Sequence, residues 1–268
     1  MSFLLLVLLA IVQGVTEFLP ISSSAHLALL HELGGTTQGD VALDVAVHLG
    51  SIVAVVAYFR ADVARAALGL GQLVRGRMAT PEAFLALCLI IATVPAVVVG
   101  AILAVTGAVD ALRDIRIIGW TMILFGVLLW WVHRTAPETR PAEGWTLRHA
   151  VIMGLWQAVA LVPGVSRSGI CMTAGRWLHY DRHSAARLSL LMSIPITLAT
   201  GALLARDVAQ SPVGTDLLVD AAIAAVLSCA AALLALVLMF RFLDRVSFTP
   251  YVIYRVVLGT VLLLIAYA

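Results

Sequence analysis

Six long apolar stretches limit the folds that this 268-residue chain can adopt. They lie at residues 41–59, 83–105, 117–132, 185–204, 217–240 and 249–266. A helix needs about 20 residues to cross a hydrocarbon core of about 30 Å, and these runs approach or exceed that length. Only 12% of the residues are charged, whereas 62% are hydrophobic. The pattern predicts an all-α polytopic membrane protein with six transmembrane helices.

Two further apolar regions, residues 1–33 and 148–180, are each interrupted near the middle. The interruptions read FLPISSS and LVPGVSRSG, which contain the proline, glycine and serine residues that mark breaks in helices. Each half has roughly 15 residues, too few to cross a membrane alone. Each region is therefore predicted to form a re-entrant helical hairpin. The N-terminal sequence MSFLLLVLLAIVQG lacks the positive region of a secretory signal, so we expect it to belong to the mature fold.

The two interrupted regions resemble each other. AIVQGVTEFLPISSS and GLWQAVALVPGVSRS share a glutamine, a valine, a proline and a serine-rich elbow when small gaps are allowed. Three apolar stretches follow each region. When a unit with an odd number of spans is repeated, its second copy crosses the membrane in the opposite orientation. This order therefore predicts an inverted-topology repeat. We expect one integral membrane domain over residues 1–268, with its repeats at approximately 1–132 and 148–268.

The distribution of arginine predicts the orientation. All 17 basic residues are arginine, and twelve of them belong to segments that would share one side of the membrane. Those segments are the predicted loop at 60–82 and the stretches 134–148, 176–187 and 241–248. The opposite loops, 110–116 and 206–216, contain three arginines and four aspartates. Because cytoplasmic loops carry the excess of positive residues, the first hairpin is expected to enter from outside and the second from the cytoplasm, with both termini outside.

The first elbow contains side chains that suit covalent catalysis. A helix that begins at the serine run would place His26 on one face with Ser22 and Ser23. Pro20 would end the preceding helix and leave Glu17 one turn before the break. A serine beside a histidine and a carboxylate can act as an activated nucleophile. The alternative is that the serines only cap a helix N-terminus.

The second elbow, PGVSRSG, suits an anion. Gly164 and Gly169 allow tight backbone, and Arg167 lies at the start of the next predicted helix. Free amides at a helix N-terminus together with a guanidinium bind phosphate well. Arg167 could instead pair with Glu17, and a substrate phosphate could lie between the two.

Other polar residues at membrane depth rank below the elbows. Asp44, His48 and Ser51 share one face of the first span, either around the site or as a polar stripe between helices. Arg255 is interpreted as a snorkelling or salt-bridged residue or as a substrate contact, with equal weight. The three cysteines lack the spacing of a disulfide framework or a zinc site.

Five motifs along essentially the whole chain resemble those of one known family. They read QGVTEFLPISSSAH, HLGSIVAVV, GLWQAVALVPGVSRSG, AARLSLLMSIP and FTPYVIYRVVLG. The family is the bacterial undecaprenyl-diphosphatases of the bacitracin-resistance type. The resemblance implies six spans and two re-entrant hairpins in an inverted repeat. It also implies that the chain hydrolyses a polyprenyl diphosphate to the lipid monophosphate and phosphate in the bacterial inner membrane, which recycles the lipid carrier of cell-wall synthesis.

The resemblance also assigns site residues. The family's paired acidic signature falls on Gln13 and Glu17, its serine pair on Ser22 and Ser23, and its histidine on His26. Its proline–glycine–serine–arginine–serine motif falls on Pro163, Gly164, Ser166, Arg167 and Ser168. Many members have glutamate at the position of Gln13, threonine at that of Cys171 and glycine at that of Ala25. The chain therefore lacks the second carboxylate of a metal clamp, and Thr173 is the nearby threonine that could contact the substrate.

The expected mechanism combines the two elbows. Arg167 and the amides of Val165–Ser168 would bind the phosphate oxygens. Ser23 is the first candidate nucleophile and Ser22 the second, with His26 as general base or as the phosphorylated group itself. Glu17 would orient the histidine or, with Gln13, hold Mg²⁺ or Ca²⁺, which prefer oxygen ligands. The serine and histidine mechanisms both fit the sequence.

Two other functions and a purely structural role compete with hydrolysis. A transporter or flippase for a lipid phosphate also uses inverted repeats with broken helices, and Arg167 could bind its anion. The acid-phosphatase type of lipid phosphatase is excluded, because its motifs include a lysine and a histidine six residues after a Ser-Arg pair, where this chain has no lysine and has Thr173. A purely structural protein would not justify the cost of burying Glu17, His26 and Arg167.

The expected partners are the polyprenyl diphosphate and the membrane lipids, with no nucleic acid. The small-residue stretch 221–231 permits a homodimer. A diphosphate headgroup cannot cross the hydrocarbon core unaided, so the site is expected to open to the outer, periplasmic face.

Overall fold

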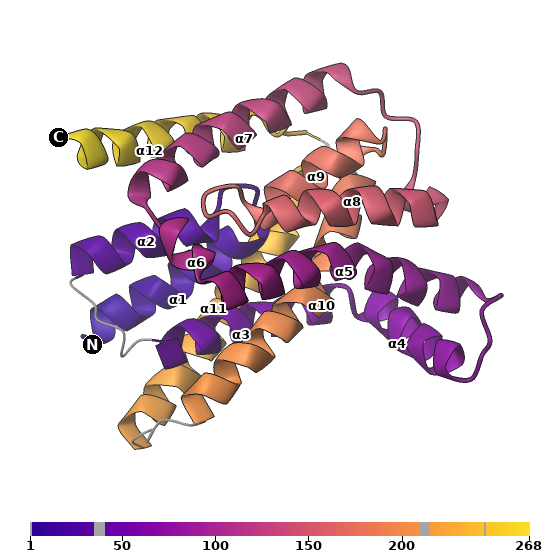
Figure 1. Cartoon of the computed structure of the whole chain (residues 1–268), viewed down its shortest axis with the longest axis horizontal. Coiled ribbons are helices and arrows are strands. Elements are labelled where there is room, and N and C mark those ends of the chain that lie inside the picture. Colours follow the sequence, from indigo (N-terminus) through magenta and orange to yellow (C-terminus); the bar gives the residue numbers. More distant parts are fainter. Residues whose placement is uncertain (1, 35–40, 210–214, 244) are drawn as a thin grey trace.

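Helices make up the regular secondary structure of residues 2–34, 41–209, 215–243 and 245–268, which are the residues that the computed structural model describes (Figure 1). They are α1 (Phe3–Phe18), α2 (Ser23–Gly34), α3 (Val41–Tyr58), α4 (Arg60–Val74), α5 (Pro81–Thr106), α6 (Ala108–Ala111), α7 (Ile115–Thr135), the 3₁₀ helix η2 (Ala142–Gly144), α8 (Leu147–Val159), α9 (Arg167–Trp177), α10 (Arg182–Ala209), α11 (Thr215–Phe242) and α12 (Thr249–Tyr267). The predicted loop at 206–216 falls partly on residues 210–214, which lie outside the described ranges.

Five helices, α5, α7, α10, α11 and α12, are long and apolar enough to cross a membrane. They match five of the predicted spans. The sixth candidate is α3 together with α4, and these two helices meet at an angle of 93°. The fold is therefore that of a polytopic helical membrane protein.

The prediction that residues 60–82 form a loop is wrong. Residues 60–74 form α4, which packs against α5. The segment is rich in alanine and leucine, which favour a helix, and arginine is a good helix former as well. The close approach between α4 and α5 depends on Gly69, because a Cβ there would overlap the backbone of Glu82.

Both re-entrant hairpins are present. The first consists of α1 and α2 and the second of α8 and α9, and none of these four helices is long enough to cross the membrane. Pro20 lies in the first break and Pro163 in the second. The two interrupted regions of the sequence are therefore the two elbows of the structure.

The helix contacts follow a repeated pattern. α1 packs along α11, and α8 packs along α5, which is the same contact if α1 corresponds to α8 and α5 to α11. α7 pairs with α12, its counterpart, and α3 pairs with α10. Figure 1 shows α7 beside α12 and α8 beside α5. The contacts agree with an internal repeat, and the inverted orientation of its second copy stays a prediction.

Small residues bring these helices together, as is common in membranes. A Cβ at Gly154 of α8 would lie 2.7 Å from the Ala92 carbonyl of α5. On the other side of the molecule, Gly14 and Gly50 meet the α11 backbone at Ser228 and Ala225. The small-residue stretch 221–231 is thus used for packing within the chain, and a homodimer stays a prediction.

Candidate active site

The two elbows meet inside the helical bundle. Arg167 Nη2 donates to Glu17 Oε1 at 2.7 Å, and Ser168 Oγ donates to the Leu19 carbonyl at 2.8 Å. The Gly164 amide donates to Ser24 Oγ at 3.3 Å. Side chains from two segments about 150 residues apart in sequence therefore form one site, as the sequence predicts.

Each elbow contains a serine with a positive φ. Ser22 has φ 72° and Ser166 has φ 69°, whereas L-residues other than glycine rarely adopt this conformation. Gly164 has φ 86°, and a Cβ there would lie 2.5 Å from the Ile118 carbonyl of α7. Strained backbone of this kind is concentrated at functional sites and persists because the surroundings hold it.

Glu17 is the centre of the polar contacts. Its Oε2 accepts from Ser23 Oγ at 2.8 Å and from Gln13 Nε2 at 2.8 Å, while Oε1 accepts from Arg167. The carboxylate is 8% exposed. The Ser23 hydroxyl is therefore bound to the Glu17 carboxylate, whereas Ser22 Oγ pairs with Ser24 Oγ at 3.0 Å.

The start of α9 offers free donors. Ser166 caps the helix by accepting from the Gly169 amide at 3.2 Å. The amides of Ser166, Arg167 and Ser168 make no hydrogen bond with a described residue. Val165 differs from the prediction, because its amide donates to the Val162 carbonyl at 3.3 Å. Three amides at one helix N-terminus form a site for an anion.

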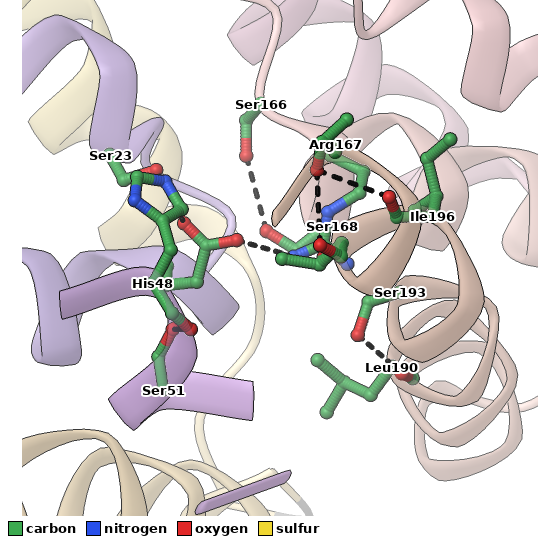
Figure 2. A network of polar contacts seen from close by, with 12 residues as sticks. Ser23, His48, Ser51, Ser166, Arg167, Ser168, Leu190, Ser193 and Ile196 are labelled. Atoms are coloured by element: carbon green, nitrogen blue, oxygen red, sulfur yellow. Dashed lines mark hydrogen bonds and ion pairs between the residues drawn. The ribbon is translucent and has the colours of Figure 1, made fainter. Parts of the chain in front are cut away.

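A cavity of about 210 Å³ lies between the elbows. Its wall includes Glu17, all three serines of the first elbow, His48, Ser166 and Arg167. Figure 2 shows Ser23 and His48 on one side and Arg167 and Ser168 on the other. Two buried polar atoms near the cavity, Arg167 Nη1 and Gln13 Oε1, have no hydrogen-bond partner among the described residues. Buried polar atoms are normally satisfied, so the cavity is built for a polar ligand.

Six predicted site residues do not line the cavity: Gln13, His26, Gly164, Val165, Ser168 and Thr173. His26 was expected to face the serine hydroxyls, but both of its ring nitrogens are engaged elsewhere: Nδ1 with the Ser22 carbonyl at 2.7 Å and Nε2 with the Tyr254 hydroxyl at 2.6 Å. Spacing placed the residue on the right helix but could not say that α12 lies beside it. Thr173 is 1% exposed and donates to the Gly169 carbonyl within α9.

His48 is the histidine that lines the cavity. Its Nδ1 lies 2.7 Å from the Asp44 carbonyl and must donate to it, which leaves Nε2 of the neutral ring with a free lone pair. That Nε2 lies 3.9 Å from Glu17 Oε2. The sequence contained the signal, since His48 was part of the polar face of the first span, but gave no reason to prefer it to His26.

The predicted Mg²⁺ or Ca²⁺ clamp is only partly available. No group of three or more His, Cys, Asp or Glu residues in the described part of the chain could hold a metal ion. Glu17 is already bonded to three donors, one of them the guanidinium of Arg167. Among the described residues, the side-chain oxygen of Gln13, Oε1, is the one oxygen of the predicted pair that has no hydrogen-bond partner.

Fold and site together define a polytopic membrane protein that holds a serine, a carboxylate and an arginine between two re-entrant elbows. The chain belongs to the family described as bacitracin resistance protein BacA, whose model matches residues 6–261. It is 60% identical to the undecaprenyl-diphosphatase of Dinoroseobacter shibae and 55% identical to that of Jannaschia sp., over the full length of each pair. It is 44% identical to the undecaprenyl-diphosphatase of Chromohalobacter salexigens over 98% of both chains.

Proposed function

We propose that this chain is an undecaprenyl-diphosphate phosphatase, which hydrolyses the lipid diphosphate to the lipid monophosphate and inorganic phosphate. The observation that carries the proposal is the Ser23 hydroxyl held on Glu17 opposite Arg167, beside three free amides. Phosphoryl transfer depends on positioning and on neutralising charge, and this arrangement offers both. The names of the full-length relatives support the same substrate.

Ser23 is the proposed nucleophile. Its Oγ attacks the terminal phosphorus, and its proton passes to Glu17 Oε2, 2.8 Å away. The bond between that phosphorus and the bridging oxygen breaks, and the lipid monophosphate leaves with the electron pair. Arg167 and the amides of Ser166–Ser168 stabilise the negative charge on the transferred group.

Water completes the reaction. It attacks the phosphoserine and gives a proton to His48 Nε2, which has the free lone pair on the cavity side. The bond between phosphorus and Ser23 Oγ breaks, Glu17 returns its proton to Oγ, and phosphate leaves. His48 then releases its proton to solvent, so the site regains its starting state.

A divalent cation, Mg²⁺ or Ca²⁺, stays part of the proposal. Gln13 Oε1 and one oxygen of Glu17 would hold it together with substrate oxygens, and the ion would add positive charge at the diphosphate. The steps above use only side chains and amides of the chain.

The decisive test of function separates hydrolysis from transport. Purified protein in detergent is incubated with a polyprenyl diphosphate, and the released phosphate is measured. Detergent removes the two compartments that transport requires, so release there supports the phosphatase. Binding of the lipid without release would favour the flippase alternative.

The two histidines should differ in their contribution to turnover. Because an amide cannot act as a base, His48→Gln should lower phosphate release from polyprenyl diphosphate by roughly 10²-fold. His26→Gln should lower it less, since His26 holds the Ser22 carbonyl outside the cavity. A larger loss in His26→Gln than in His48→Gln would return the role of base to His26.

The position of the cavity along the helices supports an opening to the outer face of the inner membrane. His48 lies in the half of α3 distant from Arg60, and Ala96 lies nearer the end of α5 than its start. Thr197 is likewise in the second half of α10, away from the Arg182 end. The cavity therefore lies nearer the face opposite the arginine-rich segments, which we assign to the periplasm.

Sidedness can be measured with single cysteines in a chain that lacks the three native ones. Ser24 and Thr200 line the cavity and are exposed, so Ser24→Cys and Thr200→Cys should react in intact cells with an impermeant thiol reagent that has entered the periplasm. Gly71→Cys on α4 has open space around it and is the matched control for the cytoplasmic face. Labelling of Gly71→Cys in intact cells, with neither cavity cysteine labelled, would reverse the orientation.

A further inference from the structure

Arg255 of α12 is the most fully buried arginine of the described chain, with 0% exposure. Its guanidinium donates to four main-chain carbonyls: Met122 at 3.2 Å, Pro20 at 3.5 Å, Gly164 at 3.1 Å and Val165 at 2.9 Å. No carboxylate of the described residues forms an ion pair with it. The sequence-based interpretations of snorkelling and of a salt bridge are therefore both wrong.

Such a residue is expensive at membrane depth. Without a counter-ion, the buried charge of an arginine must be stabilised by dipoles such as main-chain carbonyls. An apolar side chain in its place would avoid the free-energy cost of burying a charge. The carbonyls that it binds belong to both elbows, Pro20 to the first and Gly164 and Val165 to the second. One guanidinium thus joins the two broken hairpins, in addition to the contacts of the site itself.

We propose that Arg255 is a positioning residue that holds the two elbows in register for phosphoryl transfer; the inference rests on the proposed function. By holding the carbonyls of Gly164 and Val165, it fixes two peptide planes of the anion-binding loop. Because a peptide unit is planar and trans, the Ser166 amide then points away from Arg255. Ser166 lines the cavity, and its amide is one of the three free donors.

The surrounding sequence leaves room for this side chain. A Cβ at Gly169, the last residue of the PGVSRSG elbow, would lie 2.9 Å from Arg255 Nη1. A Cβ at Gly126 of α7 would lie 3.3 Å from Arg255 Cβ and 3.4 Å from Nε. Glycines on two separate elements therefore make room for the Arg255 side chain. A residue that only fills space would not need this room.

The test compares Arg255→Gln with a matched buried arginine. Arg176 is 1% exposed and also donates to main-chain carbonyls, those of His133, Ala136, Pro137 and Tyr180, none of which belongs to an elbow. We expect Arg255→Gln to lower turnover per folded protein by about 100-fold, the effect that a displacement of about 1 Å can have. Arg176→Gln should lower the melting temperature and keep the wild-type turnover of the protein that remains folded.

A double-mutant cycle separates positioning from a general loss of structure. If Arg255 acts through the register of Arg167, the effects of Arg255→Lys and Arg167→Lys should overlap, so that the double variant is within a few-fold of the slower single variant. Effects that multiply, or wild-type turnover in both Arg255 variants, would overturn the proposal. If Arg255→Gln does not fold, the cycle is measured with Arg255→Lys alone.

Binding of inorganic phosphate provides a readout that does not depend on turnover. Its dissociation constant, measured by protection against thermal unfolding, should rise at least tenfold in Arg255→Lys and stay unchanged in Arg176→Gln. Unchanged phosphate affinity in Arg255→Lys would contradict the positioning role of Arg255 and leave the proposed function unaffected. Absence of hydrolysis by the wild-type protein would instead overturn the proposed function, and the phosphate titration would still decide whether Arg255 sets the anion site.

Discussion

Ser23→Ala should lower phosphate release from polyprenyl diphosphate by roughly 10³-fold or more, the order of loss seen when a covalent nucleophile is removed. The hydroxyl of Ser23 is the one hydroxyl of the first elbow that donates to Glu17. Without it, only direct attack by water remains, in a cavity whose donors still stabilise the transferred phosphoryl group. The rate is measured with the purified protein, after its folded fraction has been matched to wild type.

Ser22→Ala is the matched control, because its hydroxyl pairs with Ser24 Oγ and not with Glu17. This variant should keep turnover within about tenfold of wild type. Acid quenching during turnover should trap phosphate on Ser23 in the wild-type protein and none in Ser23→Ala. A Ser23→Ala protein that keeps most of its activity, or phosphate trapped on a histidine, would refute the serine mechanism.

The spans were predictable from sequence because their apolar runs approach or exceed the length that a bilayer demands, and the elbows were predictable because proline and serine interrupt such runs. The sequence did not reveal α4 as a helix, because arginines interrupt its apolar residues and the helix is too short to cross a membrane alone. Its arginines predict the side of the membrane on which the segment lies, but they do not determine its conformation.

Within the site, the residues of one elbow were predictable and their directions were not. Helical spacing places His26 near Ser22 and Ser23, but the direction of its ring depends on Tyr254, which is 228 residues away. His48 enters the cavity from a third element, and Arg255 reaches both elbows from a fourth. Their roles depend on tertiary contacts that no local pattern encodes.

Arg167→Lys should be nearly as damaging as Arg167→Ala, with a loss of turnover of roughly 10²-fold or more, as is usual when a preorganised charge clamp is removed. One amino group of the guanidinium, Nη2, is held by Glu17 at 2.7 Å, and the other, Nη1, is buried with no partner among the described residues. The arginine can therefore stay anchored to Glu17 while it offers a second donor to the phosphate. A lysine ammonium carries its charge on one nitrogen and lacks the two separate amino groups of a guanidinium. It can therefore bind the Glu17 carboxylate or the substrate phosphate, but not both. Arg182→Lys, at the far end of α10 and paired with Glu138, is the control for the same substitution outside the site. Turnover in Arg167→Lys close to that of Arg182→Lys would mean that Arg167 supplies only positive charge and does not position the phosphoryl group.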